Sequence, residues 1–266
     1  MKKYTIEDLK GFEKNEEGWI MCPAGDYTEI KSFPERCRFG EWCSFGAGCS
    51  FGAGCRFGER CSFGERCSFG AGCSFGAGCR FGERCSFGAG CSFGAGCRFG
   101  AGCRFGAGCS FGEWCSFGEW CSFGECCSFG ECCSFGEWCS FGECCSFGAG
   151  CRFGKWCSFG ECCSFGAGCR FGAVFRFGER CGFEGGHIAA PGYPLLIFSG
   201  FGSENRTTYA FNCQDGIWVR CGCFSGSLEE FREKVRERHG DTPFAIEYLA
   251  VADLIERRFS REGEVR

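Results

Sequence analysis

Histidine is the scarcest chemically versatile residue of this chain, since only 2 of its 266 residues are histidine, His187 and His239. An enzyme that relies on imidazole would therefore need a cleft around one of these two positions. Long apolar runs are absent as well, so no membrane-spanning helix is expected. The segment from Met1 to Asp8 has two lysines with no apolar stretch after them, which is not the pattern of a secretory signal.

Basic residues are not in excess either. The net charge is -4 and the isoelectric point is about 5.5, so neither nucleic acid nor a membrane is expected as a partner. A chain without an export signal is expected in the cytoplasm, where reducing conditions keep cysteines as thiols. We therefore predict that most of the 32 cysteines are reduced.

The chain is dominated by one six-residue phrase, Cys-(Ser/Arg)-Phe-Gly-x-x, which repeats without a change of register from Cys37 to Glu184. Cys occupies 24 of the 25 sixth positions from 37 to 181, Phe all 25 from 39 to 183, and Gly all 24 from 40 to 178. Such regularity predicts a solenoid, in which each repeat stacks on its neighbours. It also leaves no place for a unique active site within the repeat.

The spacing within the phrase predicts a short strand followed by a corner. Cys and Phe are two residues apart, so both should face the core, while the Ser or Arg between them faces outward. Gly and the two variable residues then complete the corner. The variable residues recur at intervals of 18, as Trp120, Trp138 and Trp156 do. Three hexads should therefore form one coil, giving about eight to nine coils spaced about 4.8 Å apart.

The order Phe-Gly-x-x-Cys-x resembles the hexapeptide-repeat left-handed β-helix, with Phe in place of a large aliphatic residue and Cys in the small slot. The resemblance implies a three-sided parallel β-helix, and it is the only argument that favours left-handed coils. Pentapeptide-repeat helices are the alternative, but the six-residue period counts against them. Acyltransferases of the hexapeptide family use a histidine and loops that interrupt the repeat, and γ-class carbonic anhydrases need three metal-binding histidines. The repeat lacks both features and has no Thr for an ice-binding face, so we expect no enzyme and no cofactor.

The inward cysteines are expected to pack as small hydrophobic residues. Zinc and iron–sulfur sites need clustered ligands, whereas these cysteines are six residues apart, so no metal is expected. Additional cysteines occupy the corner slot and should face outward as reactive thiols, three of them in one column where a disulfide between coils is geometrically conceivable. These corner cysteines are Cys126, Cys132, Cys144 and Cys162.

The outer surface in the middle of the repeats has its own chemistry. Six consecutive corners carry glutamate, with no Lys or Arg between Arg104 and Arg152, and they are Glu113, Glu119, Glu125, Glu131, Glu137 and Glu143. The corner tryptophans of this region are Trp114, Trp120, Trp138 and Trp156, of which Trp114 shares an edge with Trp42. Exposed aromatics suggest a contact surface. A solvated acidic surface and stacking that only stabilises the coils are the alternatives.

We divide the chain into an N-terminal cap over 1–30, the β-helix over 31–186 and a small α+β C-terminal module over 187–266. The cap should contain a short helix from Thr5 to Lys10 and a strand from Asp26 to Ile30. The module should contain a strand over 194–201, a hairpin over 207–213 and 217–221, a helix from a capping box at Ser227 to about His239, and a helix from Pro243 to about Phe259.

A zinc site from Cys213, Cys221, Cys223 and His239 is disfavoured, because Cys213 and Cys221 should project from opposite faces of the hairpin. Residues 202–209, 215–217 and 220–224 resemble a C-terminal module of uncharacterised proteins from gut bacteria and their phages. That resemblance extends over the C-terminal module and implies a mobile-element context without a known chemistry.

The leading hypothesis is a non-enzymatic structural or interaction protein, a rigid rod whose C-terminal module caps it or binds a partner. The partner would be another protein or a second copy of the chain in a homodimer. A small-molecule or nucleotide binder that uses Arg206, Arg220 and the 202–208 loop is one alternative, and it requires a concave pocket there. A DNA-mimic inhibitor that uses the acidic corners is the other.

Overall fold

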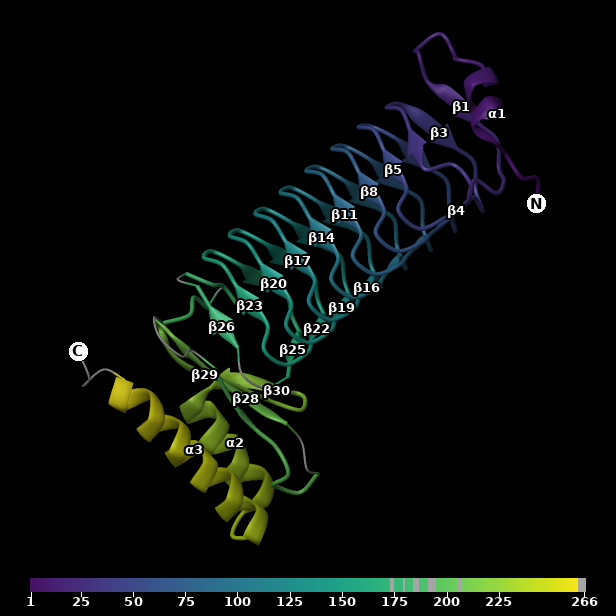
Figure 1. Cartoon of the computed structure of the whole chain (residues 1–266). Helices are drawn as coiled ribbons and strands as arrows, with labels where there is room; N and C mark the ends of the chain where they lie inside the picture. Colours follow the sequence, from purple (N-terminus) through teal and green to yellow (C-terminus); the bar gives the residue numbers. More distant parts are fainter. Residues whose placement is uncertain (173–174, 179, 184–186, 191–194, 205–206, 263–266) are drawn as a thin grey trace. The chain divides into compact units, whose positions relative to one another are not determined.

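The computed structural model describes residues 1–172, 175–178, 180–183, 187–190, 195–204 and 207–262 (Figure 1). The chain divides into two compact units, Met1–Arg176 and Phe177–Arg266, which are described one at a time. None of the helices in these residues is long and apolar enough to cross a membrane.

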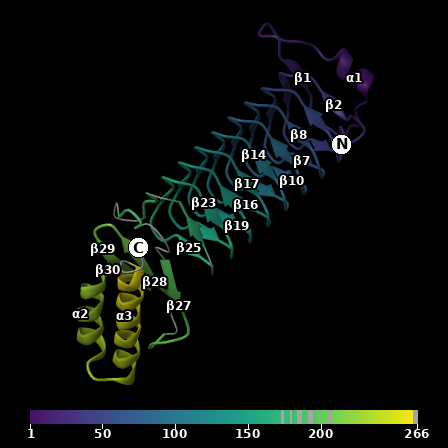
Figure 2. The ribbon, with the colours of Figure 1, turned by 60° about the vertical axis from the view of Figure 1, so that its left-hand side comes forward.

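The first unit is a solenoid of about nine parallel coils whose strands form three sheets (Figures 1 and 2). The first sheet contains β1 (Ile20–Cys22), β3 (Cys37–Phe39), β6 (Arg56–Phe57), β9 (Ser74–Phe75), β12 (Ser92–Phe93), β15 (Ser110–Phe111), β18 (Ser128–Phe129), β21 (Ser146–Phe147) and β24 (Ser164–Phe165). The second contains β4 (Ser44–Phe45), β7 (Ser62–Phe63), β10 (Arg80–Phe81), β13 (Arg98–Phe99), β16 (Ser116–Phe117), β19 (Ser134–Phe135), β22 (Arg152–Phe153) and β25 (Arg170–Phe171). The third contains β2 (Ser32–Phe33), β5 (Ser50–Phe51), β8 (Ser68–Phe69), β11 (Ser86–Phe87), β14 (Arg104–Phe105), β17 (Ser122–Phe123), β20 (Ser140–Phe141), β23 (Ser158–Phe159) and β26 (Arg176–Phe177).

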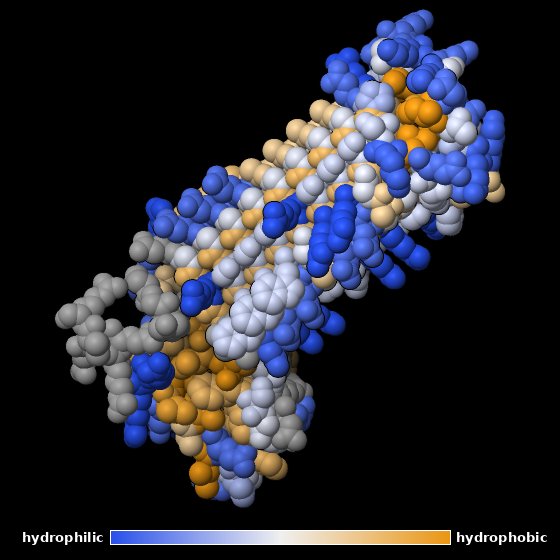
Figure 3. Space-filling model, in the orientation of Figure 1, coloured by the Kyte–Doolittle hydropathy of each residue, from blue (hydrophilic) through white to orange (hydrophobic). Residues whose placement is uncertain are grey.

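The register confirms the predicted coil of three hexads. Phe81 pairs with Phe63 on one side and with Phe99 on the other, each eighteen positions away. Every coil therefore places equivalent residues in columns, and side chains of similar hydropathy form rows across neighbouring coils in Figure 3. The expected three-sided parallel architecture is confirmed, while the left-handed sense implied by the resemblance stays a prediction.

Phenylalanine rings fill the interior of each coil. Phe93 stacks on Phe75 and on Phe111 with centroids 4.8 Å apart and rings within 2° of parallel. It also meets Phe87 and Phe99 edge to face at 5.1 Å. Each ring thus combines burial with six aromatic contacts, of which the four closest each contribute on the order of 0.5–1.5 kcal/mol.

The inward cysteine does more than fill space. The thiol of Cys91 is fully buried and donates a hydrogen bond to the carbonyl oxygen of Gly70, 21 residues earlier, at 3.5 Å. No backbone N–H donates to that carbonyl among the described residues. The Cys73 thiol donates to the carbonyl oxygen of Gly52 in the same way. Cysteine is therefore a small apolar residue that also satisfies a backbone acceptor which the strand ladder leaves open.

The glycine after each phenylalanine is required by close approach of the backbone. A Cβ atom on Gly88 would lie 2.6 Å from the amide nitrogen of Ala71 in the neighbouring coil. The second corner residue instead adopts positive φ, as at Gly90 with φ +68°, and the space around that glycine is open.

The N-terminal segment differs from its prediction in two respects. Helix α1 (Ile6–Gly11) has the expected position, with Thr5 and Asp8 forming a capping box. The expected strand from Asp26 to Ile30 is wrong, because within it only Asp26 forms bridges, to Lys3 and Ser44. The parallel ladder extends to β1, where Cys22 pairs with Phe39 inside the segment expected to be a cap.

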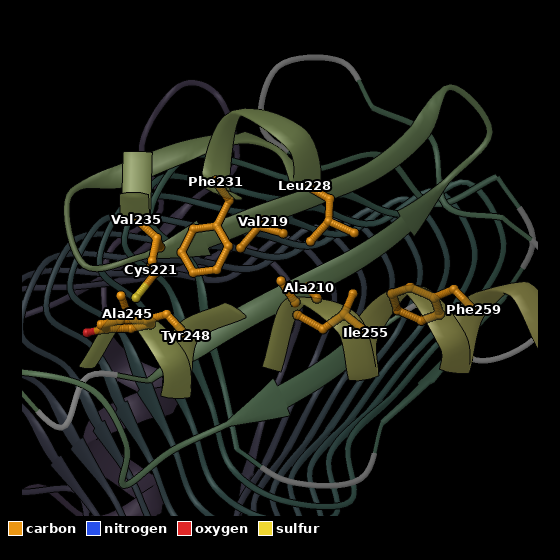
Figure 4. Packing of buried hydrophobic residues seen from close by; sticks show 11 residues of the cluster. Ala210, Val219, Cys221, Leu228, Phe231, Val235, Ala245, Tyr248, Ile255 and Phe259 are labelled. Atoms are coloured by element: carbon orange, nitrogen blue, oxygen red, sulfur yellow. The ribbon is translucent and has the colours of Figure 1, made fainter. Parts of the chain in front are cut away.

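The second unit contains an antiparallel sheet in the order β27 (Leu195–Phe198), β28 (Thr208–Cys213), β29 (Gly216–Cys221) and β30 (Phe224–Ser227), followed by α2 (Leu228–His239) and α3 (Pro243–Glu262). The hairpin, the capping box at Ser227 and the helix end at Gly240 are confirmed. Figure 4 shows the shared core, in which Val219 from the sheet lies among Phe231 and Ile255 from the helices. Residue 194, the expected start of the strand over 194–201, lies outside the described residues.

The two glycine positions of a corner should respond differently to alanine. Gly88→Ala should lower the free energy of unfolding by roughly 2–3 kcal/mol, because the new methyl group meets backbone that can move little. Gly90→Ala should cost only about 1 kcal/mol, which is the strain of a left-handed backbone conformation. Urea unfolding followed by circular dichroism measures both, and an equal loss in the two variants would contradict the packing described.

The thiol columns predict loss of stability at alkaline pH. Contact with the thiol of the preceding coil, together with burial, raises the pKa of Cys55, Cys73 and Cys133 to about 12 from an ordinary value of 9.0, although the thiol of the following coil acts in the opposite direction. Below pH 9 these thiols are protonated in both states and stability is constant. Between pH 9 and 12 only the unfolded chain ionises, so each such thiol lowers the free energy of unfolding by about 1.4 kcal/mol per pH unit.

Urea titrations at pH 7, 9, 10 and 11 test this dependence. Cys73→Ala should unfold with a pH slope shallower by about 1.4 kcal/mol per unit. A slope that the variant leaves unchanged would mean that Cys73 is not a proton-linked core residue.

Candidate interaction surfaces

The corners of the solenoid form three edges, each a column of two-residue steps. Successive steps of an edge are 18 residues apart, and we name each edge by one member. The Trp42 edge begins at 41–42 and ends at 167–168, the Trp120 edge begins at 47–48 and ends at 155–156, and the Cys126 edge begins at 35–36 and ends at 161–162. Backbone hydrogen bonds join successive steps, for example from the amide of Trp120 to the carbonyl oxygen of Glu137 at 3.0 Å. The predicted placement of Trp114 with Trp42, and of the other three tryptophans on another edge, is therefore confirmed.

The Trp120 edge carries an exposed aromatic stack. Trp120 and Trp138 lie 5.1 Å apart with rings 1° from parallel, and Trp156 continues the stack at 5.1 Å. Their exposed fractions are 59%, 42% and 46%. The outermost ring at the Gly102 side is the most exposed because glycine supplies no side chain to cover it. Trp114 on the Trp42 edge is 65% exposed.

These tryptophans occupy a strained backbone position. Trp120, Trp138 and Trp156 each have φ +61°, a left-handed conformation that costs a residue with a Cβ atom about 1 kcal/mol. The same slot holds glycine at Gly48 and Gly102, where φ is +70° and +69°. Stacking recovers on the order of 0.5–1.5 kcal/mol per contact. Stacking therefore roughly offsets the backbone strain, before burial of the ring surface is counted.

The six acidic corners form a ring rather than a stripe. Glu113, Glu119 and Glu125 stand on three different edges of one coil, and the other three stand directly beside them on the next coil. No Lys, Arg or His nitrogen of the described residues lies within 4.0 Å of the carboxylates of Glu113, Glu119, Glu125, Glu131, Glu137 or Glu143. The ring is therefore two coils thick, with about 5 Å between coils, and the one lysine beside it in a column is Lys155, one step beyond Glu137.

The Cys126 edge brings three outward thiols into one column. Cys126 and Cys144 are exposed and Cys162 is half-buried, all with φ +56°. Cys132 lies on the Trp42 edge and is half-buried. Partial desolvation, then the thiols of Cys162 and Cys126 and the carboxylate of Glu143, raise the pKa of the Cys144 thiol.

The second unit contains a small pocket of about 60 Å³, lined by Ser203, Glu204, Cys221, Cys223, Phe224, Phe231, Lys234, Val235, Arg238, His239 and Tyr248. It has room for only a few water molecules. Arg220 is not part of the lining, because its guanidinium lies 4.8 Å over the ring of Tyr209. Arg206 lies outside the described residues.

His187 forms a separate polar contact. Its Nδ1 lies 2.6 Å from a carboxylate oxygen of Asp215, and its ring lies 4.0 Å from that of Trp218. A carboxylate that orients an imidazole in this way is typical of a general base. No signal in the sequence indicated that His187 and Asp215 would lie together. The neighbouring Cys213 is no activated nucleophile, since burial and then Asp215 raise its pKa to about 12.

The zinc hypothesis for the second unit finds no support in the hairpin geometry. Cys213 pairs with Gly216 at the turn, whereas Cys221 pairs with Thr208 at the far end of the same two strands. The two cysteines are therefore separated along the hairpin. Among all described residues, no three His, Cys, Asp or Glu side chains lie close enough to share a metal ion.

A family model described as an RNA-binding, Nab2-type zinc finger matches residues 31–46, 48–70, 66–82, 97–112, 102–124 and 145–160. These stretches cover less than half of the chain. No curated protein and no solved structure matches the chain. The resemblance of the C-terminal module to modules of gut bacteria and their phages thus stays a prediction.

The matched stretches have the cysteines of such a finger but not its ligand geometry. A CCCH finger takes three cysteines and one histidine, and the matched stretches contain no histidine. Their inward cysteines occupy different sides of each coil, and their thiols donate to glycine carbonyls, as Cys61 does to Gly40 at 3.4 Å. A tetrahedral site needs converging thiolates. The match is therefore accounted for by the spacing of cysteines in the repeat.

The exposed cysteines should react with thiol reagents much faster than the inward cysteines. In the folded, reduced protein, five of the 32 cysteines should react rapidly with an aromatic disulfide reagent, namely Cys126, Cys132, Cys144, Cys162 and Cys223. Among them Cys144 should be the slowest at pH 8, because its raised pKa lowers the fraction of thiolate. Mass spectrometry of the labelled peptides identifies the sites, and denaturant should release all 32. Rapid native labelling of the inward cysteines would contradict their burial.

Proposed function

We propose that this chain is a non-enzymatic interaction protein whose solenoid presents the Trp120 edge to a basic segment of a partner protein. The observation that carries the proposal is the exposed stack of Trp120, Trp138 and Trp156 beside carboxylates without counterions. The stacking contacts recover about what the left-handed backbone costs, and 42–59% of each ring's surface stays in contact with water, which suggests a contact surface.

The chemistry of this edge favours arginine or lysine on the partner. Glu119 and Glu137 precede Trp120 and Trp138 directly, so a guanidinium could contact a carboxylate and the open ring of Trp120 together. A second copy of the chain fits this edge less well, because an antiparallel arrangement about Trp138 places Glu137 against Glu137. A mobile-element origin remains part of the proposal on the ground of the resemblance in residues 202–224.

The alternatives have weaker physical support. A DNA mimic needs acidic groups spaced along many base pairs, since duplex DNA carries one charge per about 1.7 Å of its axis, whereas the glutamate ring spans two coils. A nucleotide needs far more room than the pocket of about 60 Å³ offers. An enzyme would need a nucleophile or base in a cleft, and the thiol nearest in sequence to the His187–Asp215 pair is protonated.

Binding of a synthetic peptide of alternating arginine and glycine tests the proposal. We expect the peptide to change tryptophan fluorescence and to bind more weakly as salt increases. Glu119→Lys with Glu137→Lys should weaken binding by about tenfold or more, as loss of charge-assisted contacts implies. The matched control is Glu65→Lys with Glu83→Lys, which reverses two exposed charges on the same edge but beside Arg66 and Arg84.

A second variant set separates stacking from charge. Trp120→Gly, Trp138→Gly and Trp156→Gly together remove the rings and restore the residue that Gly102 supplies at the same slot. Binding should fall by a similar factor, measured by calorimetry, while the fold stays intact. Equal losses in the test and control charge variants would show general attraction to an acidic protein and would overturn the proposal.

A further inference from the structure

A cavity of about 460 Å³ opens on the second sheet beside the Trp42 edge, far in sequence from the tryptophan stack. Its lining consists of Met1, Trp42, Ser44, Arg60, Ser62, Gly78, Arg80, Gly96 and Arg98. Gly78 and Gly96 adjoin the hollow at two successive corner slots without a side chain, on an edge that carries Trp42, Arg60, Trp114 and Cys132 at other steps. It is more than seven times the volume of the pocket in the second unit.

Three arginines line this groove. Arg80 and Arg98 are in register on neighbouring strands, β10 and β13, so their side chains leave the same face one strand spacing apart. Arg60 stands at the corner, with its guanidinium 4.9 Å from the centroid of the Trp42 ring. Like charges placed directly opposite each other on a sheet destabilise it. The free protein therefore holds a cluster of positive charge at some cost.

No carboxylate neutralises this cluster. Among the described residues, no Asp or Glu oxygen lies within 4.0 Å of the guanidinium nitrogens of Arg60, Arg80 or Arg98. The corner slots before Gly78 and Gly96 hold Ala77 and Ala95 instead of glutamate.

Two acidic residues near the groove, Glu59 and Asp26, form no ion pair with its arginines. Glu59 stands at the corner directly before Arg60. Asp26 bridges to Ser44 at the end of the same column and accepts hydrogen bonds from the amide and hydroxyl of Thr28, at 2.9 and 2.7 Å. Three strand spacings, about 14 Å, separate Asp26 from Arg80, which exceeds the screening length at physiological salt.

We propose that this groove binds an oligophosphate, as an inorganic chain or as the phosphates of a nucleotide. Guanidinium groups bind phosphate oxygens through paired hydrogen bonds. Arg80 and Arg98 leave the sheet one strand spacing apart, about 4.8 Å, so both guanidinium groups can contact one short phosphate chain, and Arg60 in the same lining can add a third contact. The Ser62 hydroxyl donates a hydrogen bond to Ser44 Oγ at 3.4 Å, which leaves the Ser44 hydroxyl as a further donor. The site is independent of the Trp120 edge.

Calorimetry with the full chain tests the site, using sodium triphosphate, ATP and adenosine as probes and sodium sulfate at equal ionic strength as reference. Triphosphate and ATP should bind at least tenfold more tightly than sulfate. Arg80→Ser with Arg98→Ser should weaken both by about tenfold or more. Serine is the residue of this column at Ser62 and Ser116, so the fold should tolerate the change.

The chain offers a matched control for the variant. Arg152→Ser with Arg170→Ser removes an equivalent in-register arginine pair from the same sheet, which also lies beside two corner glycines, Gly150 and Gly168. The preceding corner of that pair carries Cys132, whereas the groove has Arg60 in this place. This control should change binding less than twofold. Equal affinities for triphosphate and ATP would show that the groove recognises the phosphate chain alone. Tighter binding of ATP would indicate that its base also contacts Trp42.

Three results would overturn the proposal. The first is equal weakening by the two arginine pairs, which would indicate general attraction of polyanions. The second is affinity for triphosphate no greater than for sulfate. The third is adenosine binding as tightly as ATP. Circular dichroism of each variant confirms that lost binding is not lost folding.

Discussion

In-register stacking of identical side chains in successive coils is the constraint on which the solenoid depends. A ring such as Phe93 lies between the equivalent rings of the coils on either side and is crossed by the rings of its own turn. An extra residue accommodated within a coil would place Phe opposite Cys or Gly and break all three columns beyond that point. The six-residue register within the coils is therefore a packing requirement.

The same constraint separates the interior from the corners. In the interior, the thiol of Cys91 donates to the carbonyl of Gly70, and the backbone at Gly88 lies in contact with Ala71. Each of these positions therefore accepts one residue type. At the second corner position, the side chain points into open space and only the sign of φ is fixed. Trp, Arg, Cys and Gly all occur there. Chemical variety is confined to the corners and to the middle residue of each strand, which form the outer surface.

Much of this arrangement was predictable from the sequence, because the repeat determines which residues share a column. The interval of 18 residues predicted the tryptophan edge and, with the family resemblance, the three-sided coil, whereas turn and capping residues predicted the hairpin and the helix start. The start of the ladder was missed because Ile20, Met21 and Cys22 do not match the hexad, although they pair with β3. β30 was missed because Phe224–Ser227 is short and contains glycine.

The arginine groove could not be read from the repeat for a different reason. Arg80 and Arg98 share a slot at an interval of 18, but Arg60 occupies a corner slot, so no simple interval joins all three. Their convergence needs two facts that only coordinates supply: which flat face follows which corner, and that glycine at 78 and 96 leaves the corner open. The hydrogen bond of the inward thiol was missed on similar grounds. Composition indicated a small buried residue, but not the unsatisfied carbonyl beside it.

Cysteine spacing alone does not identify a metal site, and this fold shows the physical reason. A zinc finger bends a short chain so that its ligands converge on one point within about 2.3 Å of the metal. A solenoid with the same interval between cysteines distributes them over three faces and repeats each only in the next coil. Convergence and strict repetition are therefore incompatible in the interior. Only at the Cys126 edge, where the side chains leave the core, do successive thiols face the same solvent without a packing partner between them.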